Sequence, residues 1–168
     1  MTSDGKPAPG NPFSNYTYSY GHRNPQGLAW DLSGQLYETE HGNNHHDEIN
    51  KITAGGNYGW PTIQGKESAP GMISPLAESG DSITWAPSGA VFWNGHLFFA
   101  GLRGTGLFEF NPLDNSVIKH FDGQFGRIRD VVLGPSDMLY ILTNNTDGRG
   151  SPQAEDDRII RIDPKQIK

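Results

Sequence analysis

Arginine side chains stand in three glycine-containing loops of this 168-residue sequence. The first loop carries Arg23 and Asn24, the second carries Arg103, and the third carries Arg127 and Arg129. In an extended chain Arg127 and Arg129 share a face, where two guanidinium groups repel each other unless an anion or an acid lies between them. The loops therefore offer candidate ligands for an anion. The alternatives are an ordinary polar connector and pairing with the chain's own acids.

Residues 40–50 are rich in groups that bind metal ions. The segment contains, in chain order, Glu40, His41, Gly42, Asn43, Asn44, His45, His46, Asp47, Glu48 and Asn50. Carboxylate, amide and backbone oxygens are the ligands that Ca²⁺ prefers, whereas clustered histidines could suggest Zn²⁺. Because His45 and His46 are adjacent, they would point to opposite sides of an extended chain and chelate poorly as a pair. The segment favours a hard-cation site, with a solvated polar loop as the alternative.

The composition excludes several classes of fold and partner. The 22 glycines and 12 prolines far exceed the roughly 12% average for these residues together, which excludes an all-α fold because helix interiors tolerate neither well. A net charge of −6 without any run of basic residues argues against nucleic acid as a partner. No apolar stretch approaches the ~18 residues of a membrane span. The absence of cysteine removes disulfides and thiolate chemistry.

One structural unit recurs along the chain. Its copies occupy residues 27–37, 88–98 and 130–140. Each copy is an apolar run, a tight turn and then a leucine followed by an aromatic residue: Leu36-Tyr37, Leu97-Phe98 and Leu139-Tyr140. A short alternating segment follows each copy, at residues 48–52, 107–110 and 158–162. Alternation of this kind is typical of half-buried antiparallel strands, so each unit is predicted to be a small β-meander.

The spacing of the copies predicts the architecture. A period of about 40–50 residues with several strands per unit is typical of a β-propeller. A β-sandwich also has short, regularly spaced strands, but it does not predict a leucine–aromatic pair after every turn. We therefore predict an all-β fold in which residues 1–168 form a partial propeller of about three four-stranded antiparallel blades. The blades are expected at about residues 16–62, 82–112 and 121–164, with a Gly/Pro-rich insertion at 53–81.

The predicted propeller brings the candidate ligands together. Arg23, Trp85 and the Arg127–Arg129 pair each precede the first strand of a copy, and equivalent connections of a propeller gather at one end of its channel. Several cations and a tryptophan around such a pocket suit a flat polyanion with carboxylates or phosphates. On its own, Trp85 would more often be an ordinary core residue. Since propellers close with about 4–8 blades, we also expect the two end blades to be open for a partner.

Six stretches of the sequence closely resemble the soluble PQQ-dependent aldose sugar dehydrogenases, the glucose/sorbosone dehydrogenase family. They are GHRNPQGLAWDLSGQLYETEHG, DEINKITAGGNYGWP, WAPSG, GLRGTGLFEF, GRIRDVVLGPSDMLYILTNNTDGRG and DDRIIRI, in this order along nearly the whole chain. The resemblance implies a six-bladed propeller, of which this chain is the C-terminal half. It also implies binding of pyrroloquinoline quinone (PQQ), a tricyclic quinone with three carboxylates, together with Ca²⁺.

The resemblance also implies roles for individual positions. The cofactor-binding residues would be Arg23, Asn24, Arg103, Arg127 and Arg129. His41 would lie next to the quinone, and Trp85 would stand at the sugar entrance. The backbone carbonyls of Gly42 and Asn43 would bind the catalytic Ca²⁺, although the family usually has proline at position 43. A second, structural Ca²⁺ site would lie in the region of Asp47, Glu48 and Tyr58.

The expected function is the oxidation of aldoses to lactones by a PQQ- and calcium-binding half of such an enzyme. The family's catalytic histidine lies in the N-terminal half, and none of the six histidines here falls at its position. Because a general base contributes about 10²–10⁴-fold, we expect the chain alone to be inactive or weakly active. The expected partners are an aldose, and either a second copy or the missing N-terminal half. The alternative is a non-catalytic, calcium-stabilised propeller module that binds glycan or protein.

The resemblance also implies a periplasmic or secreted location. Residues 1–6 show no apolar segment of the kind found in a signal peptide. A mature exported protein without its leader would show the same pattern, so the expected location rests on the resemblance.

Overall fold

The computed structural model describes residues 1–167. The first sheet contains, in spatial order, β1 (Pro25–Trp30), β2 (Leu36–Glu40), β3 (Glu48–Lys51) and β4 (Ala77–Glu78). The second contains β5 (Pro87–Trp93), β6 (His96–Gly101), β7 (Gly106–Asn111) and β8 (Ser116–His120). The third contains β9 (Ile128–Leu133), β10 (Leu139–Thr143) and β11 (Ile159–Ile162), and two short 3₁₀ turns follow at Pro135–Asp137 and Pro164–Gln166.

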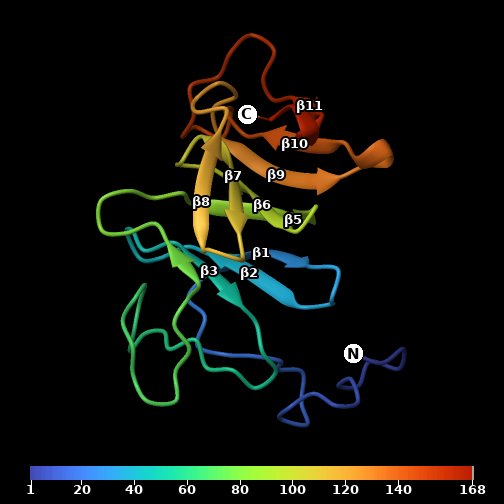
Figure 1. Cartoon of the computed structure of the whole chain (residues 1–168), viewed down its shortest axis with the longest axis vertical. Helices are drawn as coiled ribbons and strands as arrows, with labels where there is room; N and C mark the ends of the chain where they lie inside the picture. The colour runs from blue at the N-terminus through green and yellow to red at the C-terminus, as the bar shows by residue number, and fades with distance from the viewer. Residues whose placement is uncertain (168) are drawn as a thin grey trace.

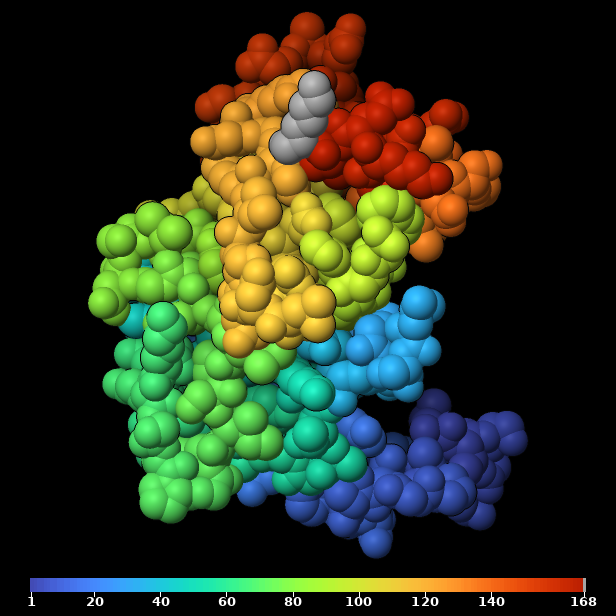
Figure 2. All heavy atoms as spheres, viewed as in Figure 1, coloured from blue at the N-terminus to red at the C-terminus, as the bar shows by residue number. Residues whose placement is uncertain are grey.

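The sheets are antiparallel meanders that follow one another in chain order. Figure 1 shows the first sheet below, the second in the middle and the third above, and Figure 2 shows the N-terminal segment in dark blue beside the first sheet. The first strands of the sheets are neighbours, with β5 packed between β1 and β9. This is the arrangement of adjacent propeller blades around an axis. No helix among residues 1–167 is long and apolar enough to cross a membrane.

The second sheet is buried on both faces because it lies between the other two. Its Phe99 and Phe110 join Ile49 of the first sheet in one apolar core. Its Phe98 and Leu107 point to the other face and join the core formed with the third sheet. From Leu97 to Ala100, successive residues of β6 are therefore all apolar, as expected for a strand that is covered on both sides.

The inner strands approach each other too closely for side chains at two positions. A Cβ atom at Gly27 would collide with the carbonyl oxygen of Ser88, and one at Gly89 would overlap the Asp130 carboxylate. Glycine is required where another backbone or side chain comes this near. These contacts hold β1, β5 and β9 together along the axis of the predicted propeller.

The predicted all-β, antiparallel architecture is confirmed, with differences at the blade borders. The third sheet has three strands among the described residues, whereas the other two have four. The fourth strand of the first sheet, Ala77–Glu78, lies inside the predicted insertion at 53–81. The strand Ser116–His120 lies beyond the expected end of the second blade at 112. Both strands escape pattern analysis because one has two residues and the other is mostly exposed.

Candidate functional site

The candidate ligands gather at one end of the sheets. Figure 1 shows the β1–β2 and β9–β10 turns on the right, and the connections that precede β1, β5 and β9 lie at the opposite end. Each of these inner strands begins with a β-bulge, where its pairing shifts register. Bulges redirect side chains and are enriched beside functional sites. In each sheet, the β-bulge therefore lies at the start of the inner strand, next to the loop that carries a predicted ligand.

The Arg23–Asn24 loop is held by a buried carboxylate. Glu40 Oε2 accepts hydrogen bonds from the backbone N–H groups of Arg23 (2.6 Å) and Asn24 (3.0 Å). The Arg23 guanidinium donates to the His41 carbonyl (3.2 Å) and to Asn43 Oδ1 (3.3 Å). Its Nε is buried and has no hydrogen-bond partner among the described residues. The structure thus brings Arg23, His41 and Asn43 together, with the buried Nε–H of the guanidinium unused.

Asp47 ties this loop cluster to the entry of the second sheet. Its Oδ2 accepts from Thr84 Oγ1 (2.5 Å) and from the backbone N–H groups of Trp85 (2.7 Å) and Ala86 (2.8 Å), while its Oδ1 accepts from Gly42 N–H (3.1 Å). A carboxylate offers about four acceptor positions. The buried Asp47 side chain already accepts four such bonds. These bonds favour a structural role that links the two loops over the predicted role as a calcium ligand.

His41, Gly42 and Asn43 form the turn that follows β2. His41 Nε2 lies 2.7 Å from the Pro87 carbonyl oxygen and so links the end of β2 to the start of β5. Within residues 1–167, neither the Gly42 nor the Asn43 carbonyl oxygen accepts a hydrogen bond. Two free backbone oxygens beside each other are suitable donors for a hard cation.

Arg103 and Arg127 line one pocket of about 410 Å³ between the second and third sheets. Arg127 is 8% exposed, and its guanidinium donates to Asp147 (3.0 Å) and to the Asn144 carbonyl (3.2 Å). Arg103 is exposed, and no hydrogen bond or ion pair within the described part of the chain uses its guanidinium. The pocket therefore presents an anchored Arg127 and an unengaged Arg103 to a ligand, and Arg149 and Arg158 also line it.

Arg129 differs from its predicted placement. The register partners jump from Ile128 to Asp130, so Arg129 is the extra residue of the β9 bulge. Arg127 is buried and Arg129 is exposed. Regular alternation would have placed the two guanidinium groups on one face, and the bulge removes that alternation.

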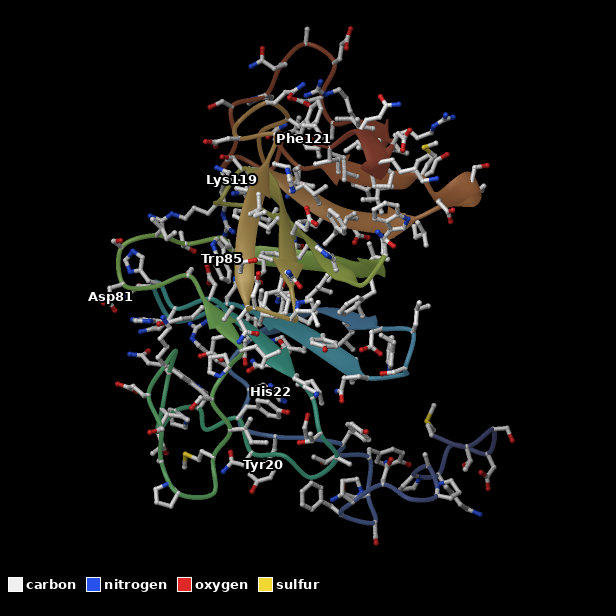
Figure 3. All side chains as sticks on the ribbon, in the orientation of Figure 1. Tyr20, His22, Asp81, Trp85, Lys119 and Phe121 are labelled. Carbon is white, nitrogen blue, oxygen red and sulfur yellow. The ribbon has the colours of Figure 1, made fainter. Side chains whose placement is uncertain are left out.

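Trp85 is a core residue. It is 6% exposed, and its ring centroid lies 5.4 Å from that of Phe99 and 6.0 Å from that of Phe108. It also lines a second pocket with Arg103 and His45. Figure 3 shows Trp85 above the first sheet, in the layer between the first and second sheets. The surroundings of Trp85 therefore show an ordinary packing role. A role at a sugar entrance stays a prediction.

Glu48 and Tyr58 lie on the other side of the first sheet. Glu48 Oε1 accepts from Gly65 N–H (2.7 Å). The Tyr58 hydroxyl donates to the Lys51 carbonyl (2.6 Å) and accepts from Thr53 N–H (3.0 Å). Both residues border a small cavity with Arg23 and His41. The structure brings this pair near the Arg23 loop, while Asp47 faces the second sheet.

The sequence model of the Glucose / Sorbosone dehydrogenase family matches residues 1–160. The chain belongs to this family. It is similar to the PQQ-bound aldose sugar dehydrogenase of Streptomyces coelicolor, with a TM-score of 0.89 and 42% identity over 96% of this chain and 49% of that one. It is 32% identical to the aldose sugar dehydrogenase YliI of Escherichia coli over 88% of this chain and 48% of that protein. It thus spans about half the length of these two glucose/sorbosone dehydrogenase relatives.

A buried acidic cluster in this chain was not predicted from its sequence. Asn50 Nδ2 lies 3.1 Å from Glu38 Oε2, 3.1 Å from Glu40 Oε1 and 3.3 Å from Glu48 Oε2. All four side chains are buried. In the sequence, Glu38 and Glu40 stand two residues apart, and so do Glu48 and Asn50. This spacing puts each pair on one face of its strand, and the strands pair so that all four share one face of the sheet. Burial, and then the charge of Glu40, raise the pKa of Glu38 to about 9.

This pKa predicts a pH-dependent stability. Between its ordinary value of 4.5 and the raised value, the folded protein holds a proton on Glu38 that the unfolded chain releases. The stabilising contribution is complete below pH 4.5 and is lost as the pH rises through 9. The unfolding free energy of chelator-treated wild type should decrease from pH 5 to pH 9. In Glu38→Gln we expect this decrease to be smaller by at least about 1 kcal/mol. Urea denaturation across this range measures it, and an unchanged slope would contradict the assignment.

Proposed function

We propose that this chain holds PQQ and its Ca²⁺ in an aldose sugar dehydrogenase that oxidises aldoses to lactones. The observation that carries the proposal is the pocket lined by Arg103 and Arg127. Guanidinium groups bind carboxylates through paired, charge-assisted hydrogen bonds, and PQQ has three carboxylates. A relative that is 42% identical to this chain has been solved in a PQQ-bound form.

The donor set fits such a ligand. Arg103 is unengaged, Arg127 is oriented by Asp147, and Arg129 is exposed at the bulge. Arg23 carries a buried Nε without a partner, and Asn24 is fixed by Glu40 beside it. We assign the quinone's carboxylates to these groups. His41 is proposed to border the quinone because its bond to Pro87 fixes its ring at the same end of the sheets.

The calcium is assigned to the backbone oxygens of Gly42 and Asn43. Neither oxygen accepts a hydrogen bond within residues 1–167, and Asp47 fixes the turn by accepting from Gly42 N–H. Oxygen ligands from a backbone turn are typical of Ca²⁺. Glu48 and the Tyr58 region, by contrast, are proposed to support a second, structural calcium.

PQQ, when bound, supplies the electron acceptor for oxidation of an aldose at C1. The chain's own residues bind and orient: the arginines hold anionic groups, and the Trp85–Phe108 layer keeps water from the floor of the neighbouring pocket. We propose no general base within this chain. By the family resemblance, the catalytic histidine lies in the N-terminal half, and none of the six histidines here falls at its position. Turnover by the chain alone is therefore expected to be absent or weak.

The open faces of the half-ring suggest a partner. Val132 and Ile159, on the third sheet, are 47% and 74% exposed, and exposed apolar side chains mark interaction surfaces. We propose that a second copy or the complementary propeller half covers this face, and that the protein acts in the periplasm or outside the cell. Mass measurement in solution distinguishes a dimer of this chain from a monomer that awaits another half.

Titration of PQQ into the chain in the presence of Ca²⁺ tests the proposed function. We expect a shift of the quinone absorbance and a rise in stability of about 2.7 kcal/mol at a ligand concentration of 100 Kd. Arg103→Ala should weaken binding by about 10–100-fold, since a charged hydrogen bond contributes about 1.5–3 kcal/mol. The control is Arg161→Ala, which removes an exposed arginine of β11 and should leave the affinity unchanged.

Two outcomes would refute the proposal. If PQQ produces no spectral or thermal change, the chain is not its binding half. If Ca²⁺ alone stabilises the chain and PQQ has no effect, the chain is the calcium-stabilised, non-catalytic module considered above. Equal affinities of wild type and Arg103→Ala would remove Arg103 from the site. Dye reduction with an aldose should stay near background in each case.

A further inference from the structure

His22 is held in a fixed orientation on the outer side of the first sheet. Its Nε2 lies 2.8 Å from Ser19 Oγ, and its ring stacks on Tyr58 with a centroid separation of 4.5 Å. Figure 3 shows His22 below the first sheet, on the opposite side from Trp85. With the ring fixed on one edge and one face, the remaining nitrogen, Nδ1, points in a single direction.

That nitrogen faces two buried carboxylates. His22 Nδ1 lies 3.5 Å from Glu40 Oε1 and 4.0 Å from Glu38 Oε2. These distances are too long for hydrogen bonds, and Nδ1 is buried without a partner. Glu38 Oε1 is also buried without a partner. Glu38 and Glu40 are 2% and 3% exposed, so water does not supply the missing contacts freely.

The surrounding polar groups supply too few hydrogen-bond donors and too little positive charge for these carboxylates. Asn50 Nδ2 faces Glu38, Glu40 and Glu48, although an amide has two hydrogens for these three acceptors. Within residues 1–167, no lysine or arginine side chain forms an ion pair with any of the three carboxylates. Buried charges are ordinarily paired or coordinated to a metal. A positive charge is the missing component of this cluster.

We propose that His22 Nδ1, Glu38 and Glu40 form a site for a divalent transition-metal ion such as Zn²⁺. One donor atom from each residue lies within 4.8 Å of the others. Ligands bound at about 2.0–2.2 Å to one zinc are separated by about 3–4 Å, so small side-chain movements close the site. A mixed nitrogen and carboxylate set suits zinc-class ions better than Ca²⁺, which takes oxygen ligands.

The neighbouring groups are those expected around such a site. Ser19 contacts the second nitrogen of the His22 imidazole, as groups behind metal-bound histidines commonly do. Glu40 would use Oε1 for the ion while Oε2 keeps the backbone N–H groups of Arg23 and Asn24. The ion would therefore rigidify the Arg23–Asn24 loop from behind. This site is separate from the free carbonyls of Gly42 and Asn43, and it stands whether or not the chain binds a quinone.

The test is calorimetric titration of Zn²⁺ into the full, chelator-treated chain. We expect one ion per chain, a rise in Tm, and a loss of affinity of at least about 100-fold in His22→Gln and in Glu38→Gln. The matched control is His46→Gln, because His46 also contacts two acids, the largely buried Glu78 and the exposed Asp81. It should leave the tight site intact. Ca²⁺ should bind no more weakly to His22→Gln than to wild type.

Crystals of the wild-type chain soaked with Zn²⁺ give a readout that does not depend on the variants folding. Anomalous scattering should place the ion between His22, Glu38 and Glu40. An ion found only at His46, or no tight site in the titration, overturns the proposal. So does zinc binding that survives both His22→Gln and Glu38→Gln. A site that takes Ca²⁺ in preference to Zn²⁺ overturns the assignment of a nitrogen ligand.

Discussion

Replacing Phe99 by alanine will lower the free energy of unfolding by about 3–5 kcal/mol. Phe99 is fully buried in β6, the second strand of the middle sheet. Its ring stacks on Phe108 at 5.0 Å and contacts Trp85. Removal of the ring leaves a cavity in the core between the first and second sheets. Urea denaturation followed by tryptophan fluorescence measures the loss.

The matched control is Leu32→Ala, in the exposed β1–β2 turn. Leu32 is fully exposed, so its truncation should change the unfolding free energy by no more than about 0.5 kcal/mol. A loss below about 1 kcal/mol in Phe99→Ala would mean that the first and second sheets do not share the core described here. Because Phe99 packs on Trp85, the same variant should also loosen the Trp85 side of the candidate site.

Replacing Asp47 by asparagine will destabilise the chain by at least about 2 kcal/mol. The amide nitrogen of asparagine cannot accept, so at least one buried backbone donor among Gly42, Trp85 and Ala86 loses its partner. The charge that strengthens the remaining bonds is lost as well. Hydrogen exchange should show faster exchange of these amides, and denaturation gives the free energy.

Asp31→Asn separates this effect from the general loss of a turn carboxylate. Like Asp47, Asp31 accepts several hydrogen bonds. Its three bonds all come from its own turn, from Ser33 and Gln35. We expect a loss of about 1 kcal/mol there. If Asp47→Asn costs no more than this control, Asp47 does not couple the two sheets. If it also leaves PQQ affinity intact, the tie is irrelevant to the candidate site.

Local patterns predicted much of the fold. The leucine–aromatic pairs do follow the three hairpin turns, where Trp30, Trp93 and Leu133 pair with Leu36, His96 and Leu139. Turn residues and side-chain alternation act over a few neighbours, so they can be read without the rest of the chain. The repeat placed the loops of Arg23, Trp85 and Arg127 at one end of the sheets, and the family resemblance added Arg103, which lines one pocket with Arg127.

Other features depend on contacts between distant residues. The β9 bulge separates Arg127 from Arg129, and alternation alone does not reveal a bulge. Asp47 reads as one more oxygen donor in an acidic loop until its partners Thr84, Trp85 and Ala86 are known. Trp85 on its own would more often be a core residue than a ligand, and the packing against Phe99 and Phe108 shows that it lies in the core.

The sequence by itself determined the first two strands of each sheet, the turns between them and the loop end at which Arg23 and Arg127 lie, because these follow from short-range alternation and backbone preferences. It also determined that Glu38 and Glu40 share one face of β2. Only the tertiary structure decided that this face is buried, since the segments around His22 and Gly65 fold back over it. Burial leaves these two strand acids without a lysine or arginine partner among the described residues, and that is the physical reason why the proposed metal site could not be read from spacing alone.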